Sequence, residues 1–376
     1  MSGPESLPHL DRLALSQALA KLPDPQFKQV VFAIQPPPGI LPADSSPLGD
    51  RVASLLQWVE NNGPGLAVLQ RVLAQITGAA ISPPEKLPEP VQPQPTLKPD
   101  PTYPCFSFEV VTVNPQGQIL GRREPIASLH QPVPLARGVT LDMVLVPGGT
   151  FMMGSPKNEL ERNEDEGPQH QVTLPRFWMG IYLVTQAQYQ AIMGNNPSNF
   201  KGNHRPVESV TWNDAVEFCD RLSQKLGQPY TLPSETQWEY ACRAGTTTPF
   251  HFGETITTDL ANYNGNYTYS SGPKGTYRQE TTDVGSFPPN GFGLYDMHGN
   301  VWEWCYNRWH DSHHFFTPAD GSAWATGGNS MLRGGSWYSY PSHCRCAYRF
   351  HYLNPDNSCD FNNGFRVVTD HLLPGT

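Results

Sequence analysis

A run of prolines between residues 83 and 104 constrains the fold of this chain more than any other feature. The stretch PPEKLPEPVQPQPTLKPDPTYP holds nine prolines in 22 positions. Because proline has no amide hydrogen and a fixed φ, such a run favours an extended, semi-rigid spacer over a helix or a strand. We therefore expect three parts: a small domain at residues 1–80, a linker at 81–104 and a larger domain at 105–376.

Residues 1–80 have the hydrophobic spacing of short amphipathic helices. DPQFKQVVFAI, DRVASLLQWVE and PGLAVLQRVLAQI each repeat apolar residues three or four positions apart, and turns rich in proline and glycine separate them. The pattern predicts a small all-α bundle. It resembles the effector-associated or death-like adaptor modules of bacterial signalling proteins, which implies that it recruits another effector protein. A folding or dimerising cap is the alternative.

Charge and composition exclude several classes of partner. Hydrophobic residues make up 38% of the chain, and its formal net charge is −9. This balance disfavours nucleic acid and anionic membranes, since both attract an excess of Lys and Arg. No apolar run is long enough to cross a bilayer, and the first residues, MSGPESLPHLDRL, lack the pattern of a signal peptide. Seven cysteines without a CxxC pair fit reduced thiols, so we expect a cytoplasmic protein.

The pattern changes from Cys105 onward. CFSFEVVTVNPQGQILGRRE alternates apolar and polar residues around an Asn-Pro-Gln-Gly turn, which predicts a β-hairpin. VTLDMVLVPGGTFMMGS predicts strand, turn and strand, and SETQWEYACRAG predicts a helix with a Ser N-cap. The acidic run NELERNEDEG at 158–167 is expected to be a solvated loop. TWNDAVEFCDRLSQKLG predicts a helix with Ala215, Phe218, Cys219 and Leu222 on one face.

Six motifs in this part occur together in one known order. They are MVLVPGGTFMMGS (143–155), VTQAQYQAIMG (184–194), PVESVTWNDAVEFC (206–219), YTLPSETQWEYACRAGT (230–246), FGLYDMHGNVWEWC (292–305) and LRGGSW with NNGFRVV (332–368). Together they resemble the formylglycine-generating enzyme or sulfatase-modifying factor family over about residues 105–370. The resemblance implies an α+β, C-type-lectin-like fold with short twisted strands, two helices and much irregular structure.

The resemblance also implies a test for enzymatic activity. In the family, two cysteines five positions apart near the GGS motif bind copper and oxidise a target cysteine. Here Cys346 has Pro341 five positions before it, and Cys344 is too close to serve as its partner in the same geometry. Because Cu(I) needs paired thiolates, we expect no copper and no enzyme. The alternative is a formylglycine-generating, sulfatase-activating copper oxidase or its inactive paralogue.

Two calcium sites are further implications of the family resemblance. GNVWEWC places several oxygen donors on one tight turn, and oxygen ligands suit a hard cation such as Ca²⁺. The alternative is that these polar groups cap turns around a tryptophan core. The implied ligands are Asn300, the carbonyl of Val301 and Glu303 at the first site, and Asn262 and the carbonyl of Tyr263 at the second.

The stretch between the last two fixed motifs has an unusual composition. From Tyr338 to Asn363 there is no Lys, Glu, Gln, Met or Trp. Randomising the adenines of an Asn codon yields Tyr, Ser, His, Cys, Phe, Leu, Asp or Asn and never those five residues. The stretch therefore resembles the variable region, at about 333–368, of a variable protein from a diversity-generating retroelement. Such proteins use a C-type-lectin-like fold, and their fixed ends resemble RGGSW and GFRVV here.

This resemblance implies a non-catalytic protein that binds ligands through a hypervariable surface. Tyr gives a large, stiff contact area at low entropic cost, and Ser, Asn and Asp add adaptable hydrogen bonds, as in antibody paratopes. We expect a protein ligand, since the set is too wide for one small-molecule pocket. An inactive family member with an incidentally aromatic loop is the alternative. The candidate ligand-binding residues are Tyr338, Ser339, Tyr340, Ser342, His343, Cys346, Tyr348, Phe350, His351, Tyr352, Leu353, Ser358, Cys359, Asp360 and Phe361.

Overall fold

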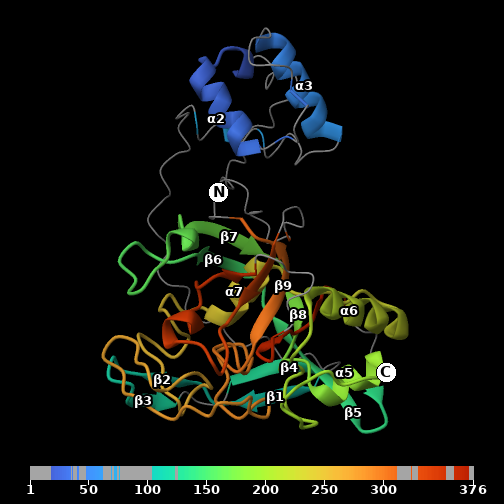
Figure 1. The fold of residues 1–376 in the computed structure, drawn as a ribbon, viewed down its shortest axis with the longest axis vertical. Coiled ribbons are helices and arrows are strands. Elements are labelled where there is room, and N and C mark those ends of the chain that lie inside the picture. The colour runs from blue at the N-terminus through green and yellow to red at the C-terminus, as the bar shows by residue number, and fades with distance from the viewer. Residues whose placement is uncertain are drawn as a thin grey trace, which may run out of the picture. The chain divides into compact units, whose positions relative to one another are not determined.

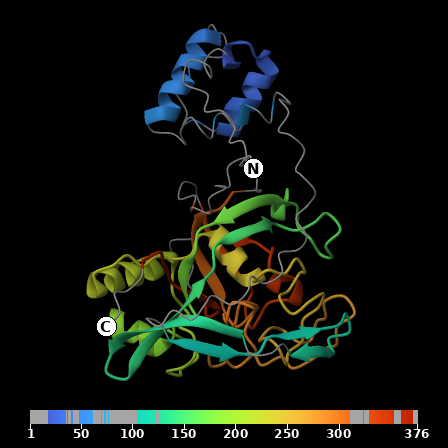
Figure 2. The same cartoon turned by 180° about the vertical axis from the view of Figure 1, so that it is seen from behind.

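The chain divides into two compact units: the described residues up to Ile76 belong to the first and those from Pro104 onward to the second. The structure is a computed structural model, and each unit is described by itself (Figures 1 and 2). The predicted linker lies outside the described residues except for Pro104. The described residues are 18–34, 36, 40–41, 48–61, 69, 72–73, 76, 104–122, 126–310, 323, 329–352 and 360–371. Among them, no helix is both long and apolar enough to cross a membrane.

The N-terminal unit contains the helices α2 (Asp24–Ile34) and α3 (Leu48–Asn61). Arg51 of α3 donates to Asp24 at 2.9 Å, and its guanidinium lies 4.9 Å from the ring centre of Phe27. The bundle as a whole stays a prediction, because much of residues 1–80 lies outside the described part. The apolar residues buried on the two helices include Phe27, Val30, Ile34, Val52, Leu55, Leu56 and Val59, all expected from the periodicity.

A five-stranded sheet forms one layer of the C-terminal unit. Its strand order is β1-β4-β5-β8-β13, and every neighbouring pair is antiparallel. The expected hairpin is present as β2 and β3, closed by the hydrogen bond from the Asn114 amide to the Gln118 carbonyl at 2.9 Å. The strands are β1 (Cys105–Phe108), β2 (Val111–Val113), β3 (Ile119–Arg122), β4 (Ile126–Ala136), β5 (Val139–Val146), β8 (Phe177–Gly180) and β13 (Val368–Thr369).

Three helices pack beside this sheet, each begun by a side-chain cap. They are α5 (Gln186–Met193), α6 (Trp212–Leu226) and α7 (Glu235–Arg243). Their N-caps are Thr185, Thr211 and Ser234, and each cap hydroxyl accepts from a backbone amide of the first turn, which satisfies a donor the helix leaves free. Helix α6 buries its predicted face of Ala215, Phe218, Cys219 and Leu222 against the five-stranded sheet and β9.

A second sheet has the strand order β11-β10-β9-β12 and carries the segment of unusual composition. That segment leaves β10, returns through β11 and ends at β12, which pairs in parallel with β9. Its two ends are therefore fixed on neighbouring strands. The remaining elements are β6 (Gly149–Met153), η1 (Glu164–Glu166), β7 (His170–Leu174), β9 (Trp302–Arg308), β10 (Ser330–Arg333), η2 (Pro341–Cys344), β11 (Phe350–His351) and β12 (Asn363–Gly364). The predicted α+β class is correct for this unit.

Candidate ligand-binding surface

The turn after β10 is rigid because glycine and tryptophan hold it from both sides. Gly335 has φ +74°, and a Cβ there would lie 2.5 Å from the Cys344 sulfur, so the position requires glycine. The Trp337 amide donates to the Asn300 carbonyl at 2.9 Å, and its indole donates to the Phe361 carbonyl at 3.2 Å. The two ends of the segment are thereby tied together at one point.

Two buried arginines fix the middle of the segment. Arg345 pairs with Glu166 at 2.5 Å and with Glu159 at 2.6 Å, and Arg349 pairs with Glu235 at 2.7 Å. Both arginines are buried, so these charge-assisted bonds lie away from water. The expectation that 158–167 is a solvated loop is wrong for these two glutamates, because Arg345 draws them inside.

Two more buried arginines fix the ends. Arg333 pairs with Glu239 of α7, and Arg366 donates from Nε and Nη2 to the two carboxylate oxygens of Glu303 of β9 at 2.6 and 2.9 Å. All four side chains are fully buried. Together with Arg345 and Arg349, these pairs hold the backbone of the segment without using any of its aromatic side chains.

Three predicted residues project into solvent along this fixed backbone. Tyr338 is 61% exposed, Tyr340 46% and Phe361 49%. Trp337 lies between two of them, with its ring centre 5.5 Å from that of Tyr338 and 5.9 Å from that of Phe361. The segment therefore exposes aromatic side chains on a backbone that the buried arginines hold in place.

Other predicted residues are half-buried, and their rings contact one another in pairs. His343 stacks on Tyr348 at 4.5 Å, and Phe350 contacts Tyr352 at 5.2 Å. The Tyr352 hydroxyl donates to the exposed Asp360 at 2.6 Å. Burial, followed by the nearby Arg345, lowers the pKa of His343 below 6.5, so this ring is neutral at neutral pH. These rings add uncharged aromatic area to the surface.

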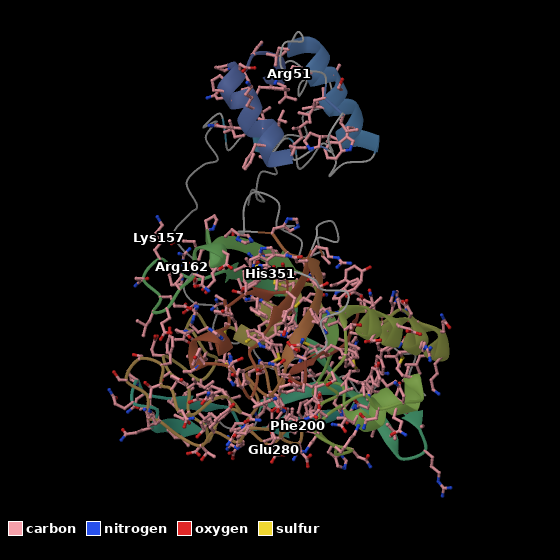
Figure 3. The ribbon with its side chains drawn as sticks, viewed as in Figure 1. Arg51, Lys157, Arg162, Phe200, Glu280 and His351 are labelled. Carbon is pink, nitrogen blue, oxygen red and sulfur yellow. The ribbon has the colours of Figure 1, made fainter. Side chains whose placement is uncertain are left out.

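Several predicted residues do not belong to an exposed surface. Ser339 and Ser342 are each 6% exposed and Cys346 is fully buried, so their assignment to the ligand-binding face is wrong. His351 packs on Trp309 with ring centres 4.1 Å apart. It lies apart in Figure 3 from Phe200, whose ring contacts that of Phe361 at 6.4 Å, so the predicted aromatic residues do not form one compact patch. Leu353, Ser358 and Cys359 lie outside the described residues.

The surface also includes aromatic residues from other parts of the chain. Tyr267 contacts Tyr340 edge-on at 4.4 Å, Phe200 contacts Trp337 at 5.4 Å, and Tyr277 stacks on Trp337 at 6.2 Å. The hydrogen bond between Tyr267 and Tyr340 raises the pKa of the Tyr340 phenol. The aromatic, Asn-rich stretch around Tyr267 was the only signal in the sequence that could have indicated this contribution.

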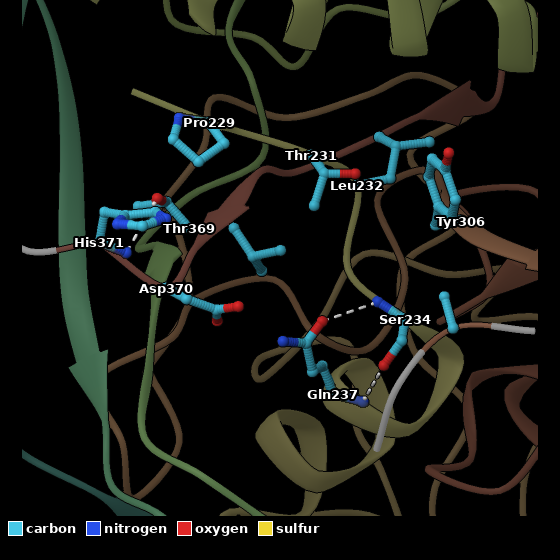
Figure 4. Close-up of a pocket in the computed structure, with 11 residues that line it drawn as sticks. Pro229, Thr231, Leu232, Ser234, Gln237, Tyr306, Thr369, Asp370 and His371 are labelled. Atoms are coloured by element: carbon cyan, nitrogen blue, oxygen red, sulfur yellow. Dashed lines mark hydrogen bonds between the residues drawn. The ribbon is translucent and has the colours of Figure 1, made fainter. Parts of the chain in front are cut away.

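A separate pocket of about 300 Å³ lies beside the start of α7 (Figure 4). Ser234 and Gln237 line it, but they are occupied with each other's backbone as the capping box of that helix. Asp370 and His371 also line it and are exposed. The acid and the base of this pocket are thus exposed to solvent, and its Ser234 hydroxyl is engaged in the helix cap.

Comparison with known proteins assigns the family. The model of the sulfatase-modifying factor enzyme 1-like domain matches residues 130–371. The chain belongs to the sulfatase-modifying factor family. Mouse formylglycine-generating enzyme is 28% identical over 290 residues, covering 61% of this chain and 75% of the relative. Among solved structures, PvdO from Pseudomonas aeruginosa has a TM-score of 0.56 and 31% identity, covering 64% of this chain and 98% of its own. Treponema denticola variable protein 1 has a TM-score of 0.54 and 25% identity, covering 64% and 99%.

The cysteines of this family member are arranged differently from a pair spaced by five positions. Cys344 packs in a core with Phe250 and Tyr263, and its sulfur lies 3.7 Å from the Tyr340 carbonyl. Cys346 packs in a different core. Five positions before Cys344 stands Ser339, so this alignment lacks a second thiol as well.

Two of the implied calcium ligands have other partners. Both Glu303 carboxylate oxygens accept from Arg366. The Asn300 side-chain oxygen accepts from the Thr282 amide at 2.9 Å and from the Asn262 side chain at 3.3 Å. These bonds fit the turn-capping alternative. The two calcium sites stay predictions: Asn300, the Val301 carbonyl and Glu303 at the first, and Asn262 and the Tyr263 carbonyl at the second.

Proposed function

We propose that residues 105–376 form a non-catalytic binding domain that presents a diversified aromatic surface to a protein ligand. One observation carries the proposal: Tyr338, Tyr340 and Phe361 are exposed, while Ser339 between the two tyrosines and the Arg–Glu pairs of the same segment are buried. Exposed aromatic residues of this kind mark interaction sites, because burying them against a partner gains much more free energy than leaving them in water. Such an arrangement allows the exposed side chains to be substituted while the backbone keeps its conformation.

The likeness to Treponema denticola variable protein 1 supports this use of the fold. We infer a C-type-lectin-like arrangement, in which short strands hold irregular loops at one face. The neutral rings and the Asp360 carboxylate offer apolar area with a few hydrogen-bonding groups, which is the mixture found in antibody paratopes. The surface of a folded protein is broad enough to contact all of these side chains at once.

The competing proposal is an enzyme of the formylglycine-generating type, as the mouse relative is named. It requires copper held by paired thiolates, and Cys344 and Cys346 pack into different cores. We therefore propose that the domain neither binds copper there nor oxidises a cysteine. Turnover of a sulfatase-type peptide, lost in Cys344→Ser, would favour the enzyme instead.

We further propose that residues 1–80 recruit a cytoplasmic effector protein. The sequence resemblance to adaptor modules suggests this role, and Phe32 of α2 is 75% exposed, which leaves an aromatic side chain available for a partner. Ligand capture by the C-terminal unit would then be coupled to signalling through the N-terminal unit.

Paired libraries displayed on yeast test the binding function. One library randomises Tyr338, Tyr340 and Phe361, and the matched control randomises the interleaved Ser339 and Ser342. We expect most members of the first library to fold, with melting temperatures within a few degrees of the parent. Selection against purified lysozyme as a test protein should yield binders. The control library should mostly fail to fold, because its positions are buried. Equal loss of folding in both libraries, or folded libraries that never yield a binder, would refute the proposal.

A further inference from the structure

The aromatic side chains of the binding surface come from two parts of the chain. The exposed rings of Tyr338, Tyr340 and Phe361 belong to the segment at about 333–368 that the sequence predicts to vary. Diversification of that segment leaves residues in other loops unchanged. The three rings that such loops add to the surface, here named the fixed rings, are Phe200, Tyr267 and Tyr277.

Tyr267 is the fixed ring beside Tyr340. The two rings meet edge-on with centres 4.4 Å apart, and Tyr267 is 47% exposed, so a ligand can reach it. The Asn264 amide donates to the Ser339 carbonyl at 3.0 Å, and the Tyr267 amide donates to the Asn264 carbonyl at 3.2 Å. Because both bonds join backbone atoms, Tyr267 keeps its place beside position 340 whichever side chain stands there.

Phe200 is the fixed ring beside Phe361. The two rings meet edge-on with centres 6.4 Å apart. The Phe200 amide donates to the carboxyl group of the fully buried Glu208 at 2.7 Å, and the Phe200 carbonyl accepts from the Gln186 side chain at 2.7 Å. Both backbone polar groups of Phe200 are therefore bound by residues outside the segment, and these bonds fix the backbone that carries the ring.

Tyr277 is the fixed ring near Tyr338. Both pack on Trp337, with ring centres 6.2 Å from it for Tyr277 and 5.5 Å for Tyr338. Partial burial, followed by the nearby Tyr338, raises the pKa of the Tyr277 phenol, so this ring is uncharged at neutral pH. Each exposed ring of the segment thus has one fixed aromatic neighbour, and the three neighbours come from different positions in the sequence.

We propose that the fixed rings contribute binding energy to every ligand of this surface, whereas the varied residues decide which ligand is bound. This inference rests on the function proposed above. A few rigid aromatic residues carry most of the binding energy of protein interfaces, and a ring whose backbone is already held loses little entropy on binding. Without constant rings, each new sequence of the segment would have to supply the whole affinity by itself.

Binders against three unrelated test proteins test this division. The library at positions 338, 340 and 361 is displayed on the full-length chain and selected separately against lysozyme, ubiquitin and serum albumin. Tyr267→Ala is then introduced into each binder, and Kd is measured by titration. We expect Kd to rise roughly tenfold or more against all three proteins. Tyr267→Phe should keep most of the affinity, because it keeps the ring.

The matched control is Met152→Ala, which should leave Kd unchanged. It removes an exposed apolar side chain from β6, at the opposite end of the C-terminal unit from Phe200 (Figures 1 and 3). Tyr267→Ala should shift the melting temperature by no more than a few degrees, because its ring is exposed. A comparable loss of stability in the variant would assign the ring a structural role and overturn the inference.

The remaining outcomes separate the inference from the function on which it rests. Phe200→Leu keeps apolar packing but removes the second fixed ring, so it should weaken binding to all three proteins as well. Folded binders that are insensitive to Tyr267→Ala and to Phe200→Leu, or that lose affinity for only one test protein, would overturn the inference and leave the proposed function standing. Folded libraries that yield no binder would refute the proposed function, and the inference with it.

Discussion

At the scale of single residues, the carboxyl group of Asp296 makes the stability of the C-terminal unit depend on pH. Its Oδ2 accepts from the Gly285 amide at 2.8 Å, while its Oδ1 has no partner in the part of the chain that the structure describes. Burial raises the pKa of Asp296 from 3.8 to about 6, against the opposing hydrogen bond from Gly285. The folded state therefore holds a proton that the unfolded state releases at lower pH.

The sign of the effect follows from this difference. The raised pKa stabilises the fold fully below about pH 4, and that stability is lost as the pH rises through 6. We expect Asp296→Asn to remove this loss, worth on the order of 2–3 kcal/mol, and to tolerate the φ of +59° at this position. Urea unfolding at pH 4 and pH 7 measures it. An unchanged difference between the two pH values would show that Asp296 is not the group responsible.

The burial of a single residue could be predicted where it depends on neighbours in the sequence. The buried face of α6 follows from helical periodicity, which needs no knowledge of the rest of the chain. The burial of Glu159 was not predictable, because its partner Arg345 lies 186 residues away and only tertiary packing joins them. The alternation of exposed and buried residues from Tyr338 to Pro341 was not predicted, because no regular strand or helix pattern marks that segment in the sequence.

At the scale of elements, α7 is the support of the binding surface. Its Glu235 pairs with Arg349 and its Glu239 with Arg333, so one helix holds both the start and the middle of the segment. The Ser N-cap of α7 was predictable from the sequence, but its charge partners were not. The parallel pairing of β12 with β9 could not be predicted either, since some 60 residues separate the two strands.

Removing one of these buried charges tests the support. Arg349→Ala leaves Glu235 buried with a weakened partner set, and we expect a loss of about 3–5 kcal/mol in the free energy of unfolding. The control is Arg221→Ala, which breaks the exposed pair with Glu217 and should cost less than about 1 kcal/mol. Urea denaturation compares them. Similar small losses in both variants would mean that the buried pair does not hold the segment.

At the scale of the whole molecule, the chain consists of two units that we expect to fold independently. The proline count of residues 83–104 predicts a linker between them, and its position stays a prediction because residues 81–103 lie outside the described part. A chain of residues 105–376 should have the melting temperature of the C-terminal transition in the full chain, to within about 2 °C. Calorimetry of both chains measures this. A shorter chain that fails to fold would show that the N-terminal unit is required.

The central claim is that a fixed scaffold carries a diversified surface, and the DNA downstream of the coding sequence tests it most directly. Sequencing should find a near-identical repeat of the region that encodes residues 333–368, beside a reverse transcriptase gene. Its adenines should fall at the codons of exposed residues such as Tyr338, Tyr340 and Phe361, and the codons of Arg345 and Arg349 should match the coding copy. Flanking DNA with no such repeat, or a repeat whose adenines fall equally on the arginine codons, would contradict the account.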